Sequence, residues 1–257
     1  MKLHFTVSGQ DQGLPILLVH GLFGRGRNLG AIARRLSEHR RVILVDQRNH
    51  GDSPHTPDHS YAAMAGDLAE VIEAQGGRAD LAGHSMGGKA AMMLALTRPE
   101  LIRKLVVMDI APVTYDHSQT HLIDAMEAID LNGVDRRSEA DRRLAEHIHS
   151  DGLRAFLLQS LDLKSDPPRW QLNLPALRDD MDRATGWPED LPKGSFDGPA
   201  LFMNGAESDY VDDAGEAAIR SYFPQARLLR IKHAGHWMHA DAPEAVAETL
   251  AAFLGKG

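Results

Sequence analysis

Six short apolar runs constrain the fold of this chain more than any other feature. They are rich in Leu, Val and Ile, as buried parallel strands are, and they span residues 15–21, 41–48, 78–85, 103–110, 198–205 and 226–231. Helical patterns separate the early runs. In residues 60–75 an apolar stripe follows Ser60, the expected N-cap, and Gly76-Gly77 ends the helix. Strands that alternate with helices predict an α/β protein with a mostly parallel central sheet flanked by helices.

This alternation breaks over residues 112–196. Amphipathic helical patterns occur there, joined by polar and Pro-rich turns, and no strand is expected. Because α/β sheets bind ligands at the carboxyl ends of their strands, we expect a helical cap over that edge, inserted between two late strands. The predicted division is a core of residues 1–111 and 197–257 and a cap of residues 112–196. A helical layer that only covers the sheet is the alternative.

Composition excludes several classes of function. The chain has 257 residues and no Cys, which excludes disulfides, thiolate metal sites and a cysteine nucleophile. A formal net charge of −8 without a dense basic cluster argues against nucleic acid or an anionic membrane as the main partner. The start, MKLHFTVSGQ, alternates like a strand and lacks the apolar stretch of a secretory signal, so a cytoplasmic protein is expected.

The segment LAGHSMGGKAAM (81–92) matches two incompatible motifs. Its glycines and lysine have the spacing of a phosphate-binding loop, G-x-x-x-x-G-K, but Ala90 stands where that loop needs a hydroxyl to hold magnesium. The same letters contain G-x-S-x-G centred on Ser85, between an expected strand and an expected helix. That context predicts a nucleophilic serine on a sharp, strained turn. Lys89 is then expected to be a solvated residue on the following helix.

A serine nucleophile requires a base and donors for the oxyanion. The amide of Met86 follows the serine and is one expected donor. The segment VHGLFGRG, at the end of an earlier strand, supplies the other, with the Leu22 amide preferred and Phe23 as the alternative. His236 follows the last strand and precedes the last helix, and a chain order with the histidine last fits one known arrangement of serine triads.

The same histidine belongs to a second pattern. His233, His236 and His239 are spaced H-x-x-H-x-x-H, with Asp241 nearby, which suggests zinc. That spacing suits a helix face, and Gly235 argues against a helix there. We therefore expect no metal, with His233 and His239 on a loop or a helix surface.

Two candidates for the acid of the triad remain open from the residues alone. After the run 198–205 the chain reads NGAESDYV, where Ser208 occupies the usual acid position and Asp209 comes one residue late. Asp109 ends LVVMD at the carboxyl end of the preceding strand. Spacing does not decide between the two aspartates.

The motifs HGLFG, VDQRNHGDSP, GHSMGGK and VVMDIAPV together resemble the α/β-hydrolase superfamily, and within it the YbfF-type bacterial esterases and their mitochondrial relatives. The resemblance covers nearly the whole chain and is loose over the cap. In that branch the acid follows the strand after the nucleophile, which implies Asp109. In the same branch a serine stands at the usual position of the acid and supports the histidine. The resemblance implies this role for Ser208. The resemblance also implies acyl ester or acyl thioester substrates and no metal or organic cofactor.

The sequence therefore predicts a serine esterase or thioesterase that cleaves small to medium acyl groups through Ser85, His236 and Asp109. A carbon–carbon bond hydrolase, a cofactor-free haloperoxidase or an acyltransferase on the same triad is the alternative, because fold does not decide among them. A further alternative is a hydrolase-like receptor that binds a small ligand without catalysis. Residues 48–50 are expected to hold their own loop together by hydrogen bonds.

Overall fold

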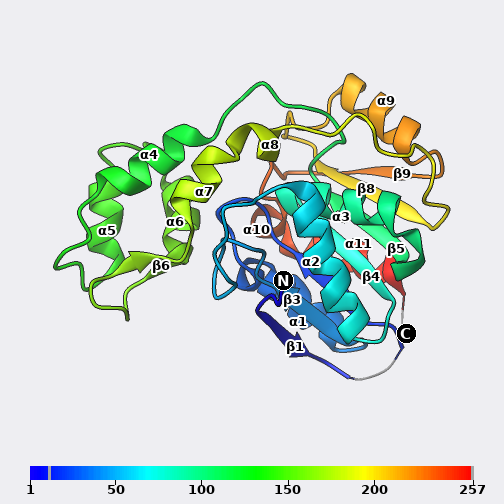
Figure 1. Cartoon of the computed structure of the whole chain (residues 1–257), viewed down its shortest axis with the longest axis horizontal. Coiled ribbons are helices and arrows are strands. Elements are labelled where there is room, and N and C mark those ends of the chain that lie inside the picture. The colour runs from blue at the N-terminus through cyan, green and yellow to red at the C-terminus, as the bar shows by residue number, and fades with distance from the viewer. Residues whose placement is uncertain (11–12, 256–257) are drawn as a thin grey trace.

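A computed structural model describes residues 1–10 and 13–255, and a seven-stranded sheet runs through it in the order β1-β3-β2-β4-β5-β8-β9 (Figure 1). Its strands are β1 (Phe5–Ser8), β2 (Ile16–Val19), β3 (Val42–Val45), β4 (Ala79–His84), β5 (Ile102–Met108), β8 (Ala200–Gly205) and β9 (Arg227–Ile231). Neighbouring strands are parallel, except that β1 is antiparallel to β3. Each predicted run matches one strand, although β5 begins one residue before its run, and this confirms the α/β fold with a mostly parallel sheet.

Helices cover both faces of this sheet because alternate side chains of its strands are apolar on both sides. In β2, Leu17 and Val19 belong to a cluster that includes residues of α2 (Tyr61–Ala74), α3 (Met86–Thr97) and α9 (Asp213–Tyr222). Ile16 and Leu18 of the same strand belong to the opposite cluster, with α1 (Gly30–Ser37) and α11 (Pro243–Leu254). Helix α2 begins as predicted, since the Ser60 hydroxyl accepts a hydrogen bond from the Ala63 amide.

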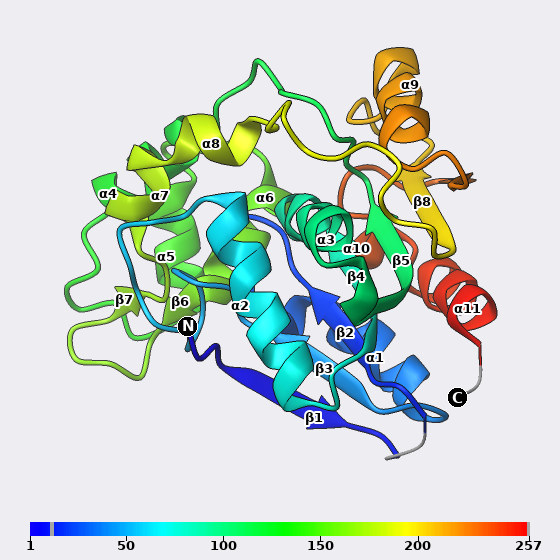
Figure 2. The same cartoon turned by 45° about the vertical axis from the view of Figure 1, so that its right-hand side comes forward.

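Figures 1 and 2 show α4 to α7 beside the sheet, on the side away from β8. Besides one short 3-10 helix (Leu158–Ser160), five α-helices lie in the chain between β5 and β8. They are α4 (Thr120–Ala128), α5 (Arg137–Leu144), α6 (Asp151–Leu157), α7 (Leu174–Asp179) and α8 (Met181–Thr185). Their apolar side chains form a separate cluster, which Phe23 of the core joins. Positions 11, 12, 256 and 257 of the predicted core lie outside the described residues.

One expectation for this insert is wrong. Two strands, β6 (Leu161–Asp162) and β7 (Arg169–Trp170), pair antiparallel within it, where no strand was expected. Each strand has only two residues, which is too short to produce the alternating pattern that identifies a strand in a sequence.

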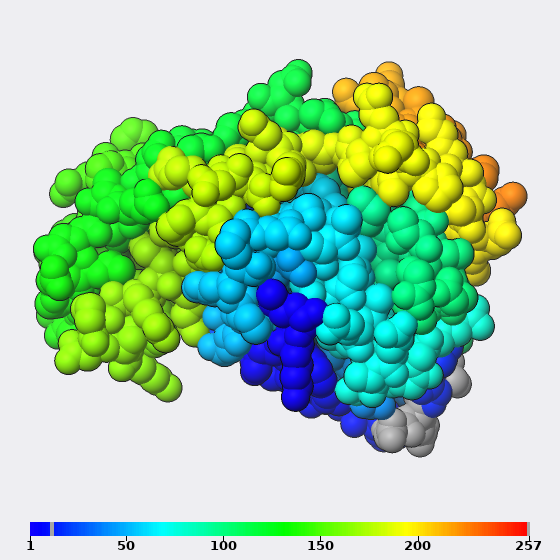
Figure 3. Space-filling model, in the orientation of Figure 1, coloured from blue at the N-terminus to red at the C-terminus, as the bar shows by residue number. Residues whose placement is uncertain are grey.

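The insert is tied to the core by backbone hydrogen bonds. The Gly51 amide donates to the Gln171 carbonyl over 2.8 Å, and the Asn173 amide donates to the Asn49 carbonyl over 2.9 Å. In the space-filling view these two parts of the chain meet without a visible gap (Figure 3). Among the described residues, every helix is too short or too polar to cross a bilayer.

Candidate active site

Ser85 occupies a strained turn between β4 and α3. Its φ of 52° and ψ of −122° lie in a region that non-glycine residues rarely adopt. A Cβ atom on Gly83 would overlap the Gly87 carbonyl, and one on Gly87 would lie 2.5 Å from the His20 carbonyl oxygen. The two glycines therefore allow strand and helix to approach closely, as the motif predicts.

The structure brings His236 to this serine from the other end of the chain. His236 lies in the loop between β9 and α10 (Met238–Asp241). Its Nε2 atom is 3.1 Å from Ser85 Oγ, and its Nδ1 atom is 2.7 Å from Asp109 Oδ2. The three side chains thus form a continuous hydrogen-bonded chain from hydroxyl to imidazole to carboxylate.

Asp109 is completely buried at the end of β5 and accepts hydrogen bonds on both oxygens. Oδ1 accepts from the Gly205 amide over 2.8 Å, while Oδ2 accepts from the Ser208 hydroxyl over 2.5 Å and faces His236. Asp209 is exposed, and no hydrogen bond joins it to His236 in the described part of the chain. Of the two aspartates between which spacing does not decide, the structure therefore places Asp109 in contact with His236.

Ser208, which the resemblance implies as a support for the histidine, lies next to Asp109. Its hydroxyl bonds to Asp109 and has no direct hydrogen bond to His236 among the described residues. Ser208 reaches the imidazole only through the carboxylate, whose negative charge it stabilises.

The loop after β2 passes directly against the serine. A Cβ atom on Gly21 would lie 3.1 Å from Ser85 Cβ. The Phe23 amide donates to His50 Nε2 over 3.1 Å, so it is occupied elsewhere. In the described part of the chain, no hydrogen bond uses the amides of Leu22 or Met86, which leaves both able to bind an oxyanion.

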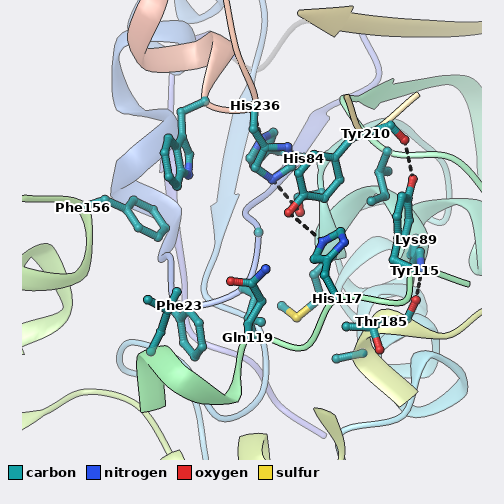
Figure 4. A pocket seen from close by; sticks show the side chains of 18 of the residues that line it. Phe23, His84, Lys89, Tyr115, His117, Gln119, Phe156, Thr185, Tyr210 and His236 are labelled. Carbon is teal, nitrogen blue, oxygen red and sulfur yellow. Dashed lines mark hydrogen bonds between the residues drawn. The ribbon is translucent and has the colours of Figure 1, made fainter. Parts of the chain in front are cut away.

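A cavity of about 240 Å³ opens on Ser85 between the sheet and the insert. The Tyr210 ring stacks on His236, with 3.8 Å between ring centroids, and the Tyr115 hydroxyl donates to the Tyr210 carbonyl over 2.7 Å. Burial raises the pKa of both phenols, so they stay neutral at ordinary pH. Figure 4 shows Phe23 and Phe156 on the other side of the cavity.

Lys89 is not solvated, contrary to expectation. Its side chain is buried and borders the cavity, and its Nζ atom donates to the carbonyls of Thr185 and Gly186 over 2.8 and 2.7 Å (Figure 4). Burial lowers the pKa of Lys89 to about 7. The prediction failed because α3 is covered by the insert as well as by its neighbours in the core, and no local pattern reveals that coverage.

The histidines of the H-x-x-H-x-x-H pattern do not converge. His233 is exposed as expected, but His239 is buried against the His84 ring, with centroids 4.6 Å apart. In residues 1–10 and 13–255, the one group with metal-ligand spacing is His4, Asp46 and Asp52. Backbone amides and an arginine already bond to its carboxylates, so it carries no metal assignment.

Sequence reasoning missed His84, which precedes the serine and borders the cavity. Its Nε2–H donates to the His236 carbonyl over 2.8 Å and holds the loop that carries the imidazole. Its position next to Ser85 was the one available signal of a role at the site. The hydrogen-bond partner, His236, lies 152 positions away in the chain and could not be inferred from the sequence.

Comparisons with known proteins show the family of this chain. A family model described as alpha/beta hydrolase fold matches residues 15–243. Esterase YbfF of Escherichia coli (strain K12) is 40% identical over 260 residues, covering 99% of each chain. The sn-1-specific diacylglycerol lipase ABHD11 of Mus musculus is 38% identical, over 99% of this chain and 85% of its own. A solved structure described as a marine microorganism esterase matches with a TM-score of 0.93 at 37% identity, covering 98% of this chain and 99% of that one.

Proposed function

This chain belongs to the α/β-hydrolase fold family and is an ester-hydrolysing enzyme, and from that premise we propose that it cleaves acyl esters with Ser85 as nucleophile. One observation carries the proposal. Ser85, His236 and Asp109 are linked over 3.1 and 2.7 Å, with the carboxylate buried behind the imidazole. This is the arrangement that activates a serine hydroxyl at neutral pH.

In the first half of the reaction, Ser85 Oγ attacks the acyl carbon while its proton passes to His236 Nε2. Asp109 holds the Nδ1 proton and stabilises the imidazolium. The negative oxygen of the adduct accepts hydrogen bonds from the amides of Leu22 and Met86, each contributing about 3 kcal/mol, as donors in other oxyanion holes do. When the adduct collapses, the leaving alcohol or thiol takes the proton from His236.

In the second half, water replaces the leaving group. His236 Nε2 accepts a proton from this water as its oxygen attacks the acyl carbon. The bond to Ser85 Oγ then breaks, the proton returns to that oxygen, and a carboxylic acid leaves. No group beyond the chain's own residues and water takes part in the proposed cycle.

The cavity supports small to medium acyl groups as substrates. Its volume of about 240 Å³ lies just below the range of about 300–1,000 Å³ that is typical of pockets for small ligands. Leu122 and Leu153 border it from the insert, and Leu22 and Ile110 from the core, so its wall is largely apolar. We propose small to medium acyl esters, with acyl thioesters of the same chain length as the second class to test.

We further propose that residues 112–196 are a cap on a core of residues 1–111 and 197–257. Phe156 and Thr185 of the insert border the cavity that opens on Ser85. The proposal also includes a cytoplasmic location, which fractionation of cells that express the tagged chain tests.

The test compares Ser85→Ala with Ser37→Ala, a control at the exposed end of α1. We expect Ser85→Ala to lose at least about a thousandfold in turnover of p-nitrophenyl esters and acyl-CoA thioesters, and Ser37→Ala to match the wild type. A fluorophosphonate probe should label Ser85, as mass spectrometry would show. Full turnover by Ser85→Ala would refute the assignment, and an inert Ser85 in a protein that still binds esters would indicate a receptor.

A further inference from the structure

The loop that carries the Leu22 amide is held from behind by two buried histidines that have no part in proton transfer. The first is His20, whose Nε2 atom accepts a hydrogen bond from the Gln47 amide over 3.0 Å. Its Nδ1 atom is 2.8 Å from the Gly21 carbonyl oxygen. Because Nε2 is the acceptor, the proton of the neutral ring is on Nδ1, and this N–H donates to Gly21.

His50 has the same arrangement. Its Nε2 atom accepts from the Phe23 amide over 3.1 Å, and its Nδ1 atom lies 2.9 Å from the Arg48 carbonyl oxygen. Both rings are buried, with centroids 5.2 Å apart. Burial lowers the pKa of His20 and holds that of His50 well below its usual value, so each ring is a neutral Nδ1–H tautomer.

The bond to Gly21 bears directly on the oxyanion donor. The Gly21 carbonyl and the Leu22 N–H belong to one peptide unit, which is planar and trans, so they point in opposite directions. His20 Nδ1–H and the Gly24 amide, at 2.8 and 3.1 Å, both donate to this carbonyl. Fixing the oxygen on one side fixes the direction of the N–H on the other. Two donors on the carbonyl also polarise the peptide and strengthen its N–H as a donor.

The bond to Phe23 has the complementary effect. Two successive amides, those of Leu22 and Phe23, follow Gly21 in this loop, and His50 binds the second one. The Phe23 backbone has a φ of 61°, a left-handed conformation that is costly for this residue and needs support from its surroundings. The hydrogen bond to His50 supplies such support.

We infer that His20 and His50 are positioning residues that direct the Leu22 amide toward the oxyanion on Ser85 and hold the Phe23 amide away from it. The inference rests on the proposed function. It requires both rings to stay neutral, because a proton on Nε2 would place a second donor against the amide of Gln47 or Phe23.

Few groups that face these rings can change their protonation. Asp46 and Arg25 face His20, with opposite effects on its pKa. The groups that face His50 are His20, His55 and His59, and each of them opposes its protonation.

Two substitutions of His20 form a matched test because each keeps one of its two hydrogen bonds. His20→Asn places an amide nitrogen near the Nδ1 position and keeps the donor to Gly21. His20→Gln reaches toward the Nε2 position and keeps the acceptor for Gln47. We expect kcat on a short acyl ester to fall about 10-fold in His20→Asn and about 100-fold in His20→Gln, with KM changed less than about twofold.

The affinity for an alkyl boronic acid, which forms a tetrahedral adduct on the serine, should fall in the same order. Equal losses of kcat in the two variants, with equal losses of thermal stability, would reduce His20 to a structural residue and overturn the inference. For His50, Gln keeps the acceptor for Phe23 and Phe removes it, so His50→Gln should retain more kcat than His50→Phe.

A measurement on the wild-type protein covers the case in which these variants do not fold. Imidazole ¹⁵N NMR should show His20 and His50 as neutral Nδ1–H tautomers throughout the pH range of activity. An Nε2–H tautomer or a charged ring in the active enzyme would overturn the inference. Failure of the proposed function looks different, since Ser85→Ala would then stay active. If Ser85→Ala is inactive and His20→Gln matches the wild type, only the positioning role fails.

Discussion

Replacing Asp109 by Asn should abolish turnover without disturbing the fold, and the surroundings of the carboxylate explain why. The Gly205 amide donates to Oδ1, so the variant's amide oxygen must stay at that position to accept this bond. Its NH₂ group then occupies the Oδ2 position, where the wild-type oxygen faces His236 Nδ1. An NH₂ group there donates to Nδ1 and moves the imidazole proton to Nε2. With Nε2 protonated, His236 cannot accept the proton of Ser85.

The size of the effect follows from the same change of tautomer. The equivalent substitution in a serine protease lowers kcat by about 10⁴. At about 1.36 kcal/mol per tenfold, that loss equals about 5.4 kcal/mol of transition-state stabilisation. We expect a similar loss in Asp109→Asn, since the side chain is completely buried and bulk water cannot replace the lost acceptor.

The assay is initial-rate hydrolysis of a short p-nitrophenyl ester, with thermal unfolding recorded on the same samples. Asp209→Asn is the matched control because this aspartate is the other candidate for the acid, lies in the loop between β8 and α9, and is exposed. Its activity should stay within about twofold of the wild type, as for most surface substitutions. If Asp209→Asn is inactive and Asp109→Asn retains turnover, the assignment of the acid is wrong.

Three more predictions concern the support of this site and the stability of the fold. Ser208→Ala removes one of the hydrogen bonds on Asp109 and should lower kcat about 10-fold, as stopped-flow kinetics would show; an unchanged kcat contradicts a supporting role. Asp80→Ala removes the carboxylate that pairs with the buried Arg40 over 2.8 Å and with Arg103, so the Arg40 guanidinium keeps only backbone carbonyls as acceptors. This should cost about 3–5 kcal/mol of unfolding free energy in urea titrations, with kcat unaffected because Asp80 is remote from the cavity; a loss below about 1 kcal/mol contradicts this. Burial lowers the pKa of His59 from 6.5 to about 4. Between pH 6.5 and pH 4 the unfolded chain therefore binds a proton on this histidine that the native protein does not bind. Unfolding free energy should therefore fall as pH drops from 6.5 toward 4, by up to about 1.4 kcal/mol per pH unit from this group; a urea midpoint that stays constant across the window would disprove it.

The sequence predicts the sheet well because six of its seven strands are local runs of apolar residues and β1 is a local alternation. Ser85 was predicted as the nucleophile for the same reason, since strand, turn and helix are contiguous around it. The two-residue strands β6 and β7 left no pattern of this kind. The burial of Lys89 left no local pattern either, because it depends on residues of the insert about 100 positions later in the chain.

The acid was the hardest member of the site to predict, for a related reason. Asp109 and Asp209 both follow strands that end at the same edge of the sheet. Their positions in the sequence do not tell which of them lies close to His236. Hydrogen bonds from Gly205 and Ser208 distinguish them in space. The tautomers of His20 and His50 depend in the same way on amides that are 27 positions distant in the chain.

The ammonium of Lys89 has a consequence for protein engineering. It lies one helical turn after Ser85 and donates to two backbone oxygens of the insert, those of Thr185 and Gly186. A chimera that grafts a foreign lid onto this scaffold must therefore present two carbonyls to the Lys89 Nζ atom. Otherwise a buried amine, whose pKa burial lowers to about 7, is left without acceptors next to Ser85.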